Sequence, residues 1–205
     1  MISLIETYAR CTGLKIGEPY TKQDFFPLPF VKYITLSAGS GQVAKNFDHY
    51  QIVIDLLNPI LSPLDIHIVQ LGDKDTPLFA GIYDLRGKTN IAQSTYLIKG
   101  SLTHFGNDSW GIHRAGILGT PLCGLYGTTH PESHGPYWKN GPTILLESHR
   151  WGRKCSFGAE GQPKSINLIP PESVAEAVLS LLNIKHSKFT ATQFIGQYYQ
   201  HTIFD

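Results

Sequence analysis

Three short polar stretches of this sequence combine residue types that suit a bound anion. SAGSGQVAK (residues 37–45) holds two glycines ahead of Lys45, and GDKD (72–75) and GNDSWGIH (106–113) are the other two. Glycines let the backbone turn sharply, and the free amides at a helix start carry the positive end of the helix dipole. Together with a lysine ammonium, such groups favour a phosphate or diphosphate.

The first and third stretches also have a simpler interpretation. The first matches neither G-x-x-x-x-G-K-[ST] nor G-x-G-x-x-G, and it would serve equally as a flexible turn with a solvated lysine. In the third, Asn107 or Asp108 could merely cap a helix. The functional hypothesis sets Ser109 against a phosphate and Asp108 against sugar hydroxyls. His113, about one and a half turns along the helix, would then reach the phosphate or fill the helix–sheet interface.

Metal and hydrolase chemistry find less support. His130 and His134 are four positions apart, but Pro131 and Gly135 argue against a continuous helix, and no carboxylate completes a known ligand pattern. No metal site is predicted. The G-x-S-x-G elbow of a serine hydrolase is absent from the sequence.

The elements that must position these stretches alternate between strands and helices. The predicted strands are 33–36, 65–71, 102–106, 122–126 and 143–147. The predicted helices are 1–11, 47–61, 90–98, 109–118 and 170–182. This alternation predicts the α/β class, a Rossmann-like parallel sheet with helices on both faces. Because ligands bind beyond the carboxyl ends of such strands, all three polar stretches should open on one edge.

The expected organisation has three parts. Residues 1–32 form an N-terminal helix and an irregular extension, 33–183 form the Rossmann-like domain, and 184–205 form a C-terminal tail. Residues 151–162, rich in Gly, Lys and Arg, are predicted to form a surface loop.

Bulk composition narrows the functional classes. Of 205 residues 41% are hydrophobic and 16% charged, which indicates a globular chain. Lys plus Arg (17) nearly balances Asp plus Glu (16), so no broad nucleic-acid footprint is expected. Three scattered cysteines, no apolar run of membrane-span length and no signal-peptide pattern favour a cytoplasmic location without a transmembrane segment.

Read in order, three segments resemble one known family: YITLSAGSGQVAKNFDHY, HIVQLGDKD, and LRGKTNIAQSTYLIKGSLTHFGNDSWGIHRAGILGTPLCGLYGTTHP. The resemblance is to glycosyltransferase family nine, the bacterial ADP-heptose:lipopolysaccharide heptosyltransferases, and specifically to their C-terminal donor-binding half. These enzymes have the GT-B fold, two Rossmann-like domains with the active site in the cleft. The likeness covers roughly residues 33–131, and residues 166–182 more loosely.

The resemblance implies a role for each matching position. Asp108 would touch the donor sugar. Ser40 and Lys45 would contact the donor phosphates. Ser109 and the amides that follow it would cradle the diphosphate, with His113 supporting. The remaining positions near the donor or at the cleft edge would be Gly72, Asp73, Asn107, Thr128 and Thr129. The implied donor is a nucleoside-diphosphate sugar, with no cofactor required.

Two departures from the family pattern bear on function. Trp110 stands where the family usually has Gly after N-D-S, and only about thirty residues precede the first predicted strand. The expectation is therefore a nucleotide-sugar-binding glycosyltransferase-like protein, with transfer to a glycan or lipid-linked acceptor only if a homodimer or partner chain completes the cleft. The alternative is a non-catalytic nucleotide- or sugar-binding or assembly module. Whether the chain is an enzyme is left open at this point.

Overall fold

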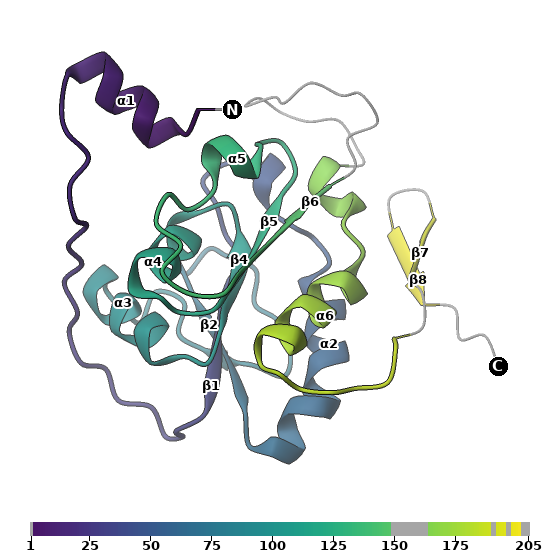
Figure 1. Ribbon diagram of the computed structural model, residues 1–205. Helices are drawn as coiled ribbons and strands as arrows, with labels where there is room; N and C mark the ends of the chain where they lie inside the picture. Colours follow the sequence, from purple (N-terminus) through teal and green to yellow (C-terminus); the bar gives the residue numbers. More distant parts are fainter. Residues whose placement is uncertain (1, 149–163, 190–191, 196–197, 202–205) are drawn as a thin grey trace.

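A six-stranded parallel sheet forms the centre of the molecule (Figure 1). The computed structural model describes residues 2–148, 164–189, 192–195 and 198–201. From edge to edge the strand order is β3-β2-β1-β4-β5-β6. The strands are β1 (Tyr33–Ser37), β2 (His67–Leu71), β3 (Tyr83–Asp84), β4 (His104–Asn107), β5 (Leu122–Tyr126) and β6 (Thr143–Glu147). This architecture confirms the predicted Rossmann-like α/β class.

The register of the central strands aligns their carboxyl ends. Ser37, the last residue of β1, lies opposite Leu71 of β2 on one side and Gly106 of β4 on the other. Gly106 is required here, because a Cβ at this position would come 2.4 Å from the carbonyl oxygen of Ser37. The loops after β1, β2 and β4 therefore leave the same edge side by side, as the sequence predicted.

Helices cover both faces of the sheet (Figure 1). One apolar cluster joins the sheet to α2 (Tyr50–Leu61) and α6 (Pro171–Leu181), and the other joins it to α3 (Ile91–Gly100) and α4 (Trp110–Leu118). In α2 the buried residues recur at three or four positions and form the inward stripe: Tyr50, Val53, Ile54, Leu57 and Leu61. Burial of this stripe, more than intrinsic propensity, stabilises such a helix.

The start of α2 differs from the prediction. The helix begins at Tyr50, not at Phe47, and a short 3₁₀ helix, η1 (Val43–Lys45), lies ahead of it. Phe47 is buried, and its backbone N–H donates to the side-chain oxygen of Asn107 (3.4 Å). This segment is therefore held against β4, because the backbone N–H of Phe47 donates across the fold to Asn107 and not to a carbonyl oxygen of a helix.

Several short elements were not predicted. They are β3, the four-residue helix α5 (Pro131–His134), and the 3₁₀ helices η2 (Ser62–Leu64) and η3 (Ser165–Leu168). The expectation that Pro131 would prevent a helix between His130 and His134 was wrong. Pro131 occupies the first helical position, where its missing N–H has no intrahelical role. An antiparallel pair, β7 (Thr192–Ile195) and β8 (Tyr198–His201), follows near the C-terminus.

The N-terminal helix α1 (Leu4–Thr12) lies apart from the sheet, at the upper left of Figure 1. Ser3 and Glu6 form a capping box at its start, and Gly13 ends it with φ 71°. An extended segment returns to β1, and Phe26, Leu28 and Phe30 of that segment pack against the apolar cluster of α3 and α4.

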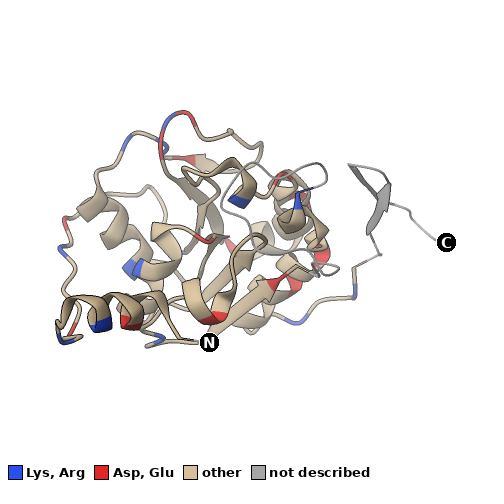
Figure 2. Ribbon diagram, turned by 90° about the horizontal axis from the view of Figure 1, so that it is seen from above, with Lys and Arg blue, Asp and Glu red and all other residues tan. Residues whose placement is uncertain are grey.

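Charges of both signs are interspersed over the described chain in Figure 2, with no face of a single sign in that view. Within the described residues no helix is long and apolar enough to cross a membrane. The predicted surface loop at 151–162 lies outside the described residues.

Candidate functional site

A cleft of about 780 Å³ opens at the carboxyl ends of β1, β2 and β4. All three polar stretches contribute to its walls, which is the arrangement that the sequence predicted. Six of the predicted site residues line it: Ser40, Lys45, Gly72, Asp73, Asp108 and Ser109. The other four, Asn107, His113, Thr128 and Thr129, lie outside its lining.

An ion pair between Lys45 and Asp108 joins the first and third stretches. Lys45 Nζ donates to Asp108 Oδ2 at 2.7 Å, and the hydroxyl of Thr129 donates to the same oxygen at 2.7 Å. His113 Nε2 lies 3.7 Å from the other oxygen, Oδ1. Lys45 and Asp108 are largely buried, with side chains 16% and 5% exposed. The carboxylate is therefore held in one orientation by groups from three separate segments.

The same contacts set the ionisation of Asp108. Burial by itself would raise the pKa of this carboxyl, but the contacts with His113, Lys45 and Thr129 outweigh burial and lower the pKa to about 2. Asp108 is thus an anion at neutral pH. Its charge offsets that of Lys45, so the pair presents an ordered, nearly neutral wall to the cleft.

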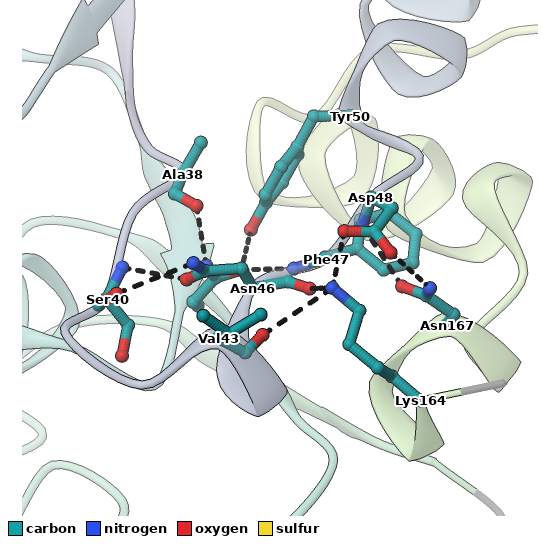
Figure 3. A network of polar contacts seen from close by, with 10 residues as sticks. Ala38, Ser40, Val43, Asn46, Phe47, Asp48, Tyr50, Lys164 and Asn167 are labelled. Carbon is teal, nitrogen blue, oxygen red and sulfur yellow. Dashed lines mark hydrogen bonds and ion pairs between the residues drawn. The ribbon is translucent and has the colours of Figure 1, made fainter. Parts of the chain in front are cut away.

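Asn107 lies beneath the cleft and not in its wall. Its Oδ1 accepts from the hydroxyl of Tyr50 (2.7 Å), and its Nδ2 donates to the carbonyl oxygen of Ala38 (2.6 Å) and to Asn46 Oδ1 (3.2 Å). Asn46 in turn accepts from the backbone N–H of Ser40 at 2.8 Å (Figure 3). The amide of Asn107 therefore links the end of β4 to the loop that carries Ser40 and Lys45.

Lys164 is a site-forming residue that the sequence analysis missed. It is 5% exposed, and its ammonium donates to the carbonyl oxygen of Asn46 (2.7 Å) and to the carboxylate of Asp48 (Figure 3). Asn167 Nδ2 donates to the second Asp48 oxygen at 2.7 Å. These contacts fix the segment directly after Lys45. No local pattern marks them, because more than a hundred residues separate Lys164 from its partners.

Helix α4 begins at the cleft without a side-chain cap. The interpretation of Asn107 or Asp108 as the helix cap was wrong. The N-cap is Ser109, and its side chain makes no capping hydrogen bond. The Oγ of Ser109 is buried and has no hydrogen-bond partner among the described residues. The first backbone N–H groups of an α-helix have no intrahelical acceptor, so an uncapped start beside a cleft is suited to an anion.

Trp110 and Gly111 shape the entry to α4. Trp110 is its first residue, lines the cleft and is 37% exposed. The glycine expected at that position comes one residue later. A Cβ on Gly111 would lie 2.6 Å from His104 Nε2 and 2.7 Å from Ser37 Oγ, so only glycine lets α4 approach the ends of β1 and β4 this closely.

The loop after β2 is held from behind by Arg86. The guanidinium of Arg86 pairs with Asp84 at 2.8 Å and donates to the carbonyl oxygen of Thr76. The backbone N–H of Gly87 donates to the carbonyl oxygen of Gly72 at 2.7 Å. Gly72 has φ 135°, a conformation that favours glycine. This loop, which carries Asp73, therefore forms a fixed wall of the cleft.

Thr128 and Thr129, two further predicted residues, follow β5 and are buried. Thr129 contacts the carboxylate of Asp108 directly, while Thr128 is buried with its hydroxyl unpartnered within the described chain. His130 pairs with Glu147 at 2.8 Å. Among the residues that the structure describes, no group of three or more His, Cys, Asp or Glu side chains could hold a metal ion.

A family model and curated proteins each match part of this chain. Residues 71–159 match the model of glycosyltransferase family 9 (heptosyltransferase). Over 99 residues the chain is 31% identical to lipopolysaccharide heptosyltransferase 2 of Escherichia coli strain K12, a match that covers 48% of this chain and 28% of that protein.

Solved structures of this type share the fold. The E. coli ADP-heptose LPS heptosyltransferase II matches with a TM-score of 0.57 and 23% identity, over 89% of this chain and 53% of that one. The dodecameric iron-containing heptosyltransferase TibC of enterotoxigenic E. coli, solved with ADP-D-beta-D-heptose, matches with a TM-score of 0.68 and 12% identity over the same shares. The present chain thus spans about half the length of these solved relatives.

Proposed function

Because this chain is a relative of the glycosyltransferase family 9 heptosyltransferases, we propose that its cleft binds a nucleoside-diphosphate sugar. The observation that carries the proposal is the juxtaposition of Lys45, paired with Asp108 at 2.7 Å, with the uncapped start of α4 in one cleft. The donor present in the TibC structure, ADP-D-beta-D-heptose, belongs to the same ligand class.

The cleft offers a separate place for each part of such a ligand. The diphosphate would accept hydrogen bonds from the Lys45 ammonium, the Ser109 hydroxyl and the first amides of α4, all of which border the cleft. The nucleoside would lie towards the loop that carries Gly72 and Asp73. The sugar would lie beside Asp108, whose carboxylate accepts hydrogen bonds from hydroxyl groups. Metal and other cofactors are not required by this proposal.

The same groups would assist glycosyl transfer. When the bond between the sugar and the diphosphate breaks, negative charge grows on the leaving phosphate, and the helix-start amides with Lys45 are placed to stabilise it. A base must also take the proton of the acceptor hydroxyl. In this proposal that base belongs to an acceptor-binding unit that faces the cleft, whether further residues of a longer protein, a second copy or a partner chain.

A second candidate function is a binding module without transfer. It is favoured by Trp110, whose bulky side chain lines the cleft at the start of α4 where glycine is usual in the family. It is also favoured by the engagement of both Asp108 oxygens within the protein. Under this alternative a nucleotide sugar would bind and be neither transferred nor hydrolysed.

Thermal unfolding with ADP, UDP, GDP and CDP, each free and as a sugar conjugate, tests the proposal. At a hundred times its dissociation constant the correct ligand should stabilise the protein by about 2.7 kcal/mol. Lys45→Ala should weaken this ligand at least tenfold in calorimetric titration, whereas Lys185→Ala, which removes an exposed lysine outside the cleft lining, should not.

The outcomes separate the two functions. Absence of a shift with every nucleotide would overturn both. A shift without sugar release or transfer to added glycans would favour the binding module. If folded Lys45→Ala, verified by circular dichroism, bound as tightly as the native chain, the ligand would lie outside this cleft.

A further inference from the structure

A second groove adjoins the cleft on the outer side of α4. Its volume is about 390 Å³, and the residues that line it include the aromatic residues Tyr20, Trp110, Tyr137 and Trp138 together with Arg114. Trp110 lines both the groove and the cleft. The two spaces therefore meet across a single indole.

The spacing of residues along α4 builds one wall of the groove. Trp110, His113, Arg114 and Ile117 all line it, and their i, i+3, i+4, i+7 spacing puts them on one helix face. The opposite face, formed by the small or apolar residues Gly111, Ile112 and Ala115, is buried against the sheet. The side chains that line the groove are therefore not among the buried residues with which α4 packs on the core.

The second wall is held rigidly against α4. A Cβ on Gly116 would lie 2.3 Å from the carbonyl oxygen of Trp138, so glycine permits a very close approach of the loop. Asn140 then fastens it, since its backbone N–H donates to Gly116 O (3.1 Å) and its Nδ2 donates to Ile117 O (2.9 Å). Tyr137 and Trp138, which pack edge to face with ring centres 5.1 Å apart, are therefore held in place beside the helix.

Arg114 gives the groove its charge. It has no ion-pair or hydrogen-bond partner among the described residues, and the groove lining contains no carboxylate. A guanidinium is always charged and matches carboxylate or phosphate oxygens in a two-point arrangement. The groove lining therefore combines four aromatic residues with one cation that is unpaired within the described part of the chain.

We infer that this groove binds a sugar ring that carries an anionic substituent. The faces of aromatic rings are electron-rich, and the C–H faces of a pyranose carry the complementary partial charge, so rings that line a groove suit a sugar better than a flexible peptide. Arg114 would bind the anionic group. The groove meets the cleft at Trp110, so a sugar bound there would lie beside the proposed donor site, although its binding does not depend on the donor function.

Indole N–H signals of ¹⁵N-labelled protein provide the test. The chain has three tryptophans, and Trp→Phe variants assign the signals of Trp110 and Trp138. The probes are a panel of hexose 6-phosphates, the parent hexoses and inorganic phosphate. We expect hexose phosphates to move both signals at concentrations about tenfold lower than the parent hexoses, the effect of one charge-assisted contact. Inorganic phosphate alone should leave Trp138 unmoved.

Matched variants locate the binding. Arg114→Gln should remove the preference for the phosphorylated sugar, and Lys185→Gln should preserve it. Tyr137→Ala, a change at a partly exposed side chain, should weaken every sugar, and Tyr83→Ala, a similarly exposed tyrosine on β3, should weaken none. Lys45→Ala should not affect hexose phosphates.

Three results would overturn the inference. The first is no indole shift with any hexose phosphate. The second is loss of the shifts in Lys45→Ala, which would place the sugar phosphate in the donor cleft. The third is a change of oligomeric state in Tyr137→Ala, measured as the mass of the assembly in solution, when the native chain binds no sugar. This result would make the groove a protein interface. The outcome of the nucleotide-binding measurements, which test the proposed donor site, does not depend on these sugar-binding results.

Discussion

The hydroxyl of Tyr50 donates a 2.7 Å hydrogen bond to Oδ1 of Asn107, and both side chains are fully buried. The same amide donates to the carbonyl oxygen of Ala38, so the start of α2, the end of β4 and the loop after β1 meet on one side chain. Because that loop leads to Lys45, Asn107 helps to determine where Lys45 meets Asp108.

Asn107→Ala should lower the free energy of unfolding by about 3 kcal/mol, because it leaves several buried polar groups without partners. Tyr50→Phe removes one of those partners and should cost about 1 kcal/mol. Urea unfolding of both single variants and the double variant measures the coupling. Additive effects would contradict a shared network, since residues in direct contact should show non-additivity of about 1 kcal/mol.

Asp108 should make stability depend on pH in the acid range. Its folded pKa, about 2, lies below the ordinary value of 3.8, so its contribution is complete above about pH 4 and is lost as pH falls towards 2. The shift corresponds to about 2 kcal/mol. Native protein and Asp108→Asn should therefore differ in unfolding free energy by about that much at pH 7 and converge near pH 2. A constant difference across that range would contradict the shift.

His104 should produce a second pH dependence at milder acidity. It is fully buried, and this burial lowers its pKa from 6.5 to about 3, so the folded state keeps it neutral. Between about pH 6.5 and pH 3 the unfolded chain binds the proton and the folded chain does not, which costs up to about 1.4 kcal/mol per pH unit. Stability from this residue is thus complete above pH 6.5 and declines below it.

The variant His104→Gln, which keeps a neutral polar side chain, should flatten the stability profile between pH 4 and pH 6.5. Chemical unfolding across this range measures the slope. His134→Gln is the comparison, because His134 is only partly buried whereas His104 is fully buried. An unchanged slope in His104→Gln would show that the residue titrates normally.

Lys164→Met should loosen the segment that follows Lys45. Loss of the contacts with Asn46 and Asp48 should cost about 2 kcal/mol, the usual range for hydrogen bonds to a charged group. If the proposed donor site is correct, nucleotide binding should also weaken, although Lys164 does not line the cleft. Lys32→Met, at an exposed lysine on the opposite edge, is the control. Equal effects of both variants would remove the special role of Lys164.

Local pattern accounts for much of this fold. The strands β1, β4, β5 and β6 and the helices α3, α4 and α6 lie within a few residues of their predicted bounds, because apolar periodicity and capping residues act over short distances. Asn90 caps α3, and its side-chain oxygen accepts from the backbone N–H of Gln93. The two-residue strand β3 and the 3₁₀ helix η1 were missed, because elements this short carry too few residues to show a period.

The sequence by itself determined that three polar stretches would share one sheet edge, since parallel strands joined by helices all expose their carboxyl ends on the same side. It also determined that Ser40, Lys45, Asp108 and Ser109 would be near one another. Only the tertiary structure decided that Lys45 and Asp108, 63 positions apart, form an ion pair, that Asn107 faces inwards, and that Lys164 holds the loop. Such contacts depend on how finished elements pack together, and local periodicity carries no information about partners so distant along the chain.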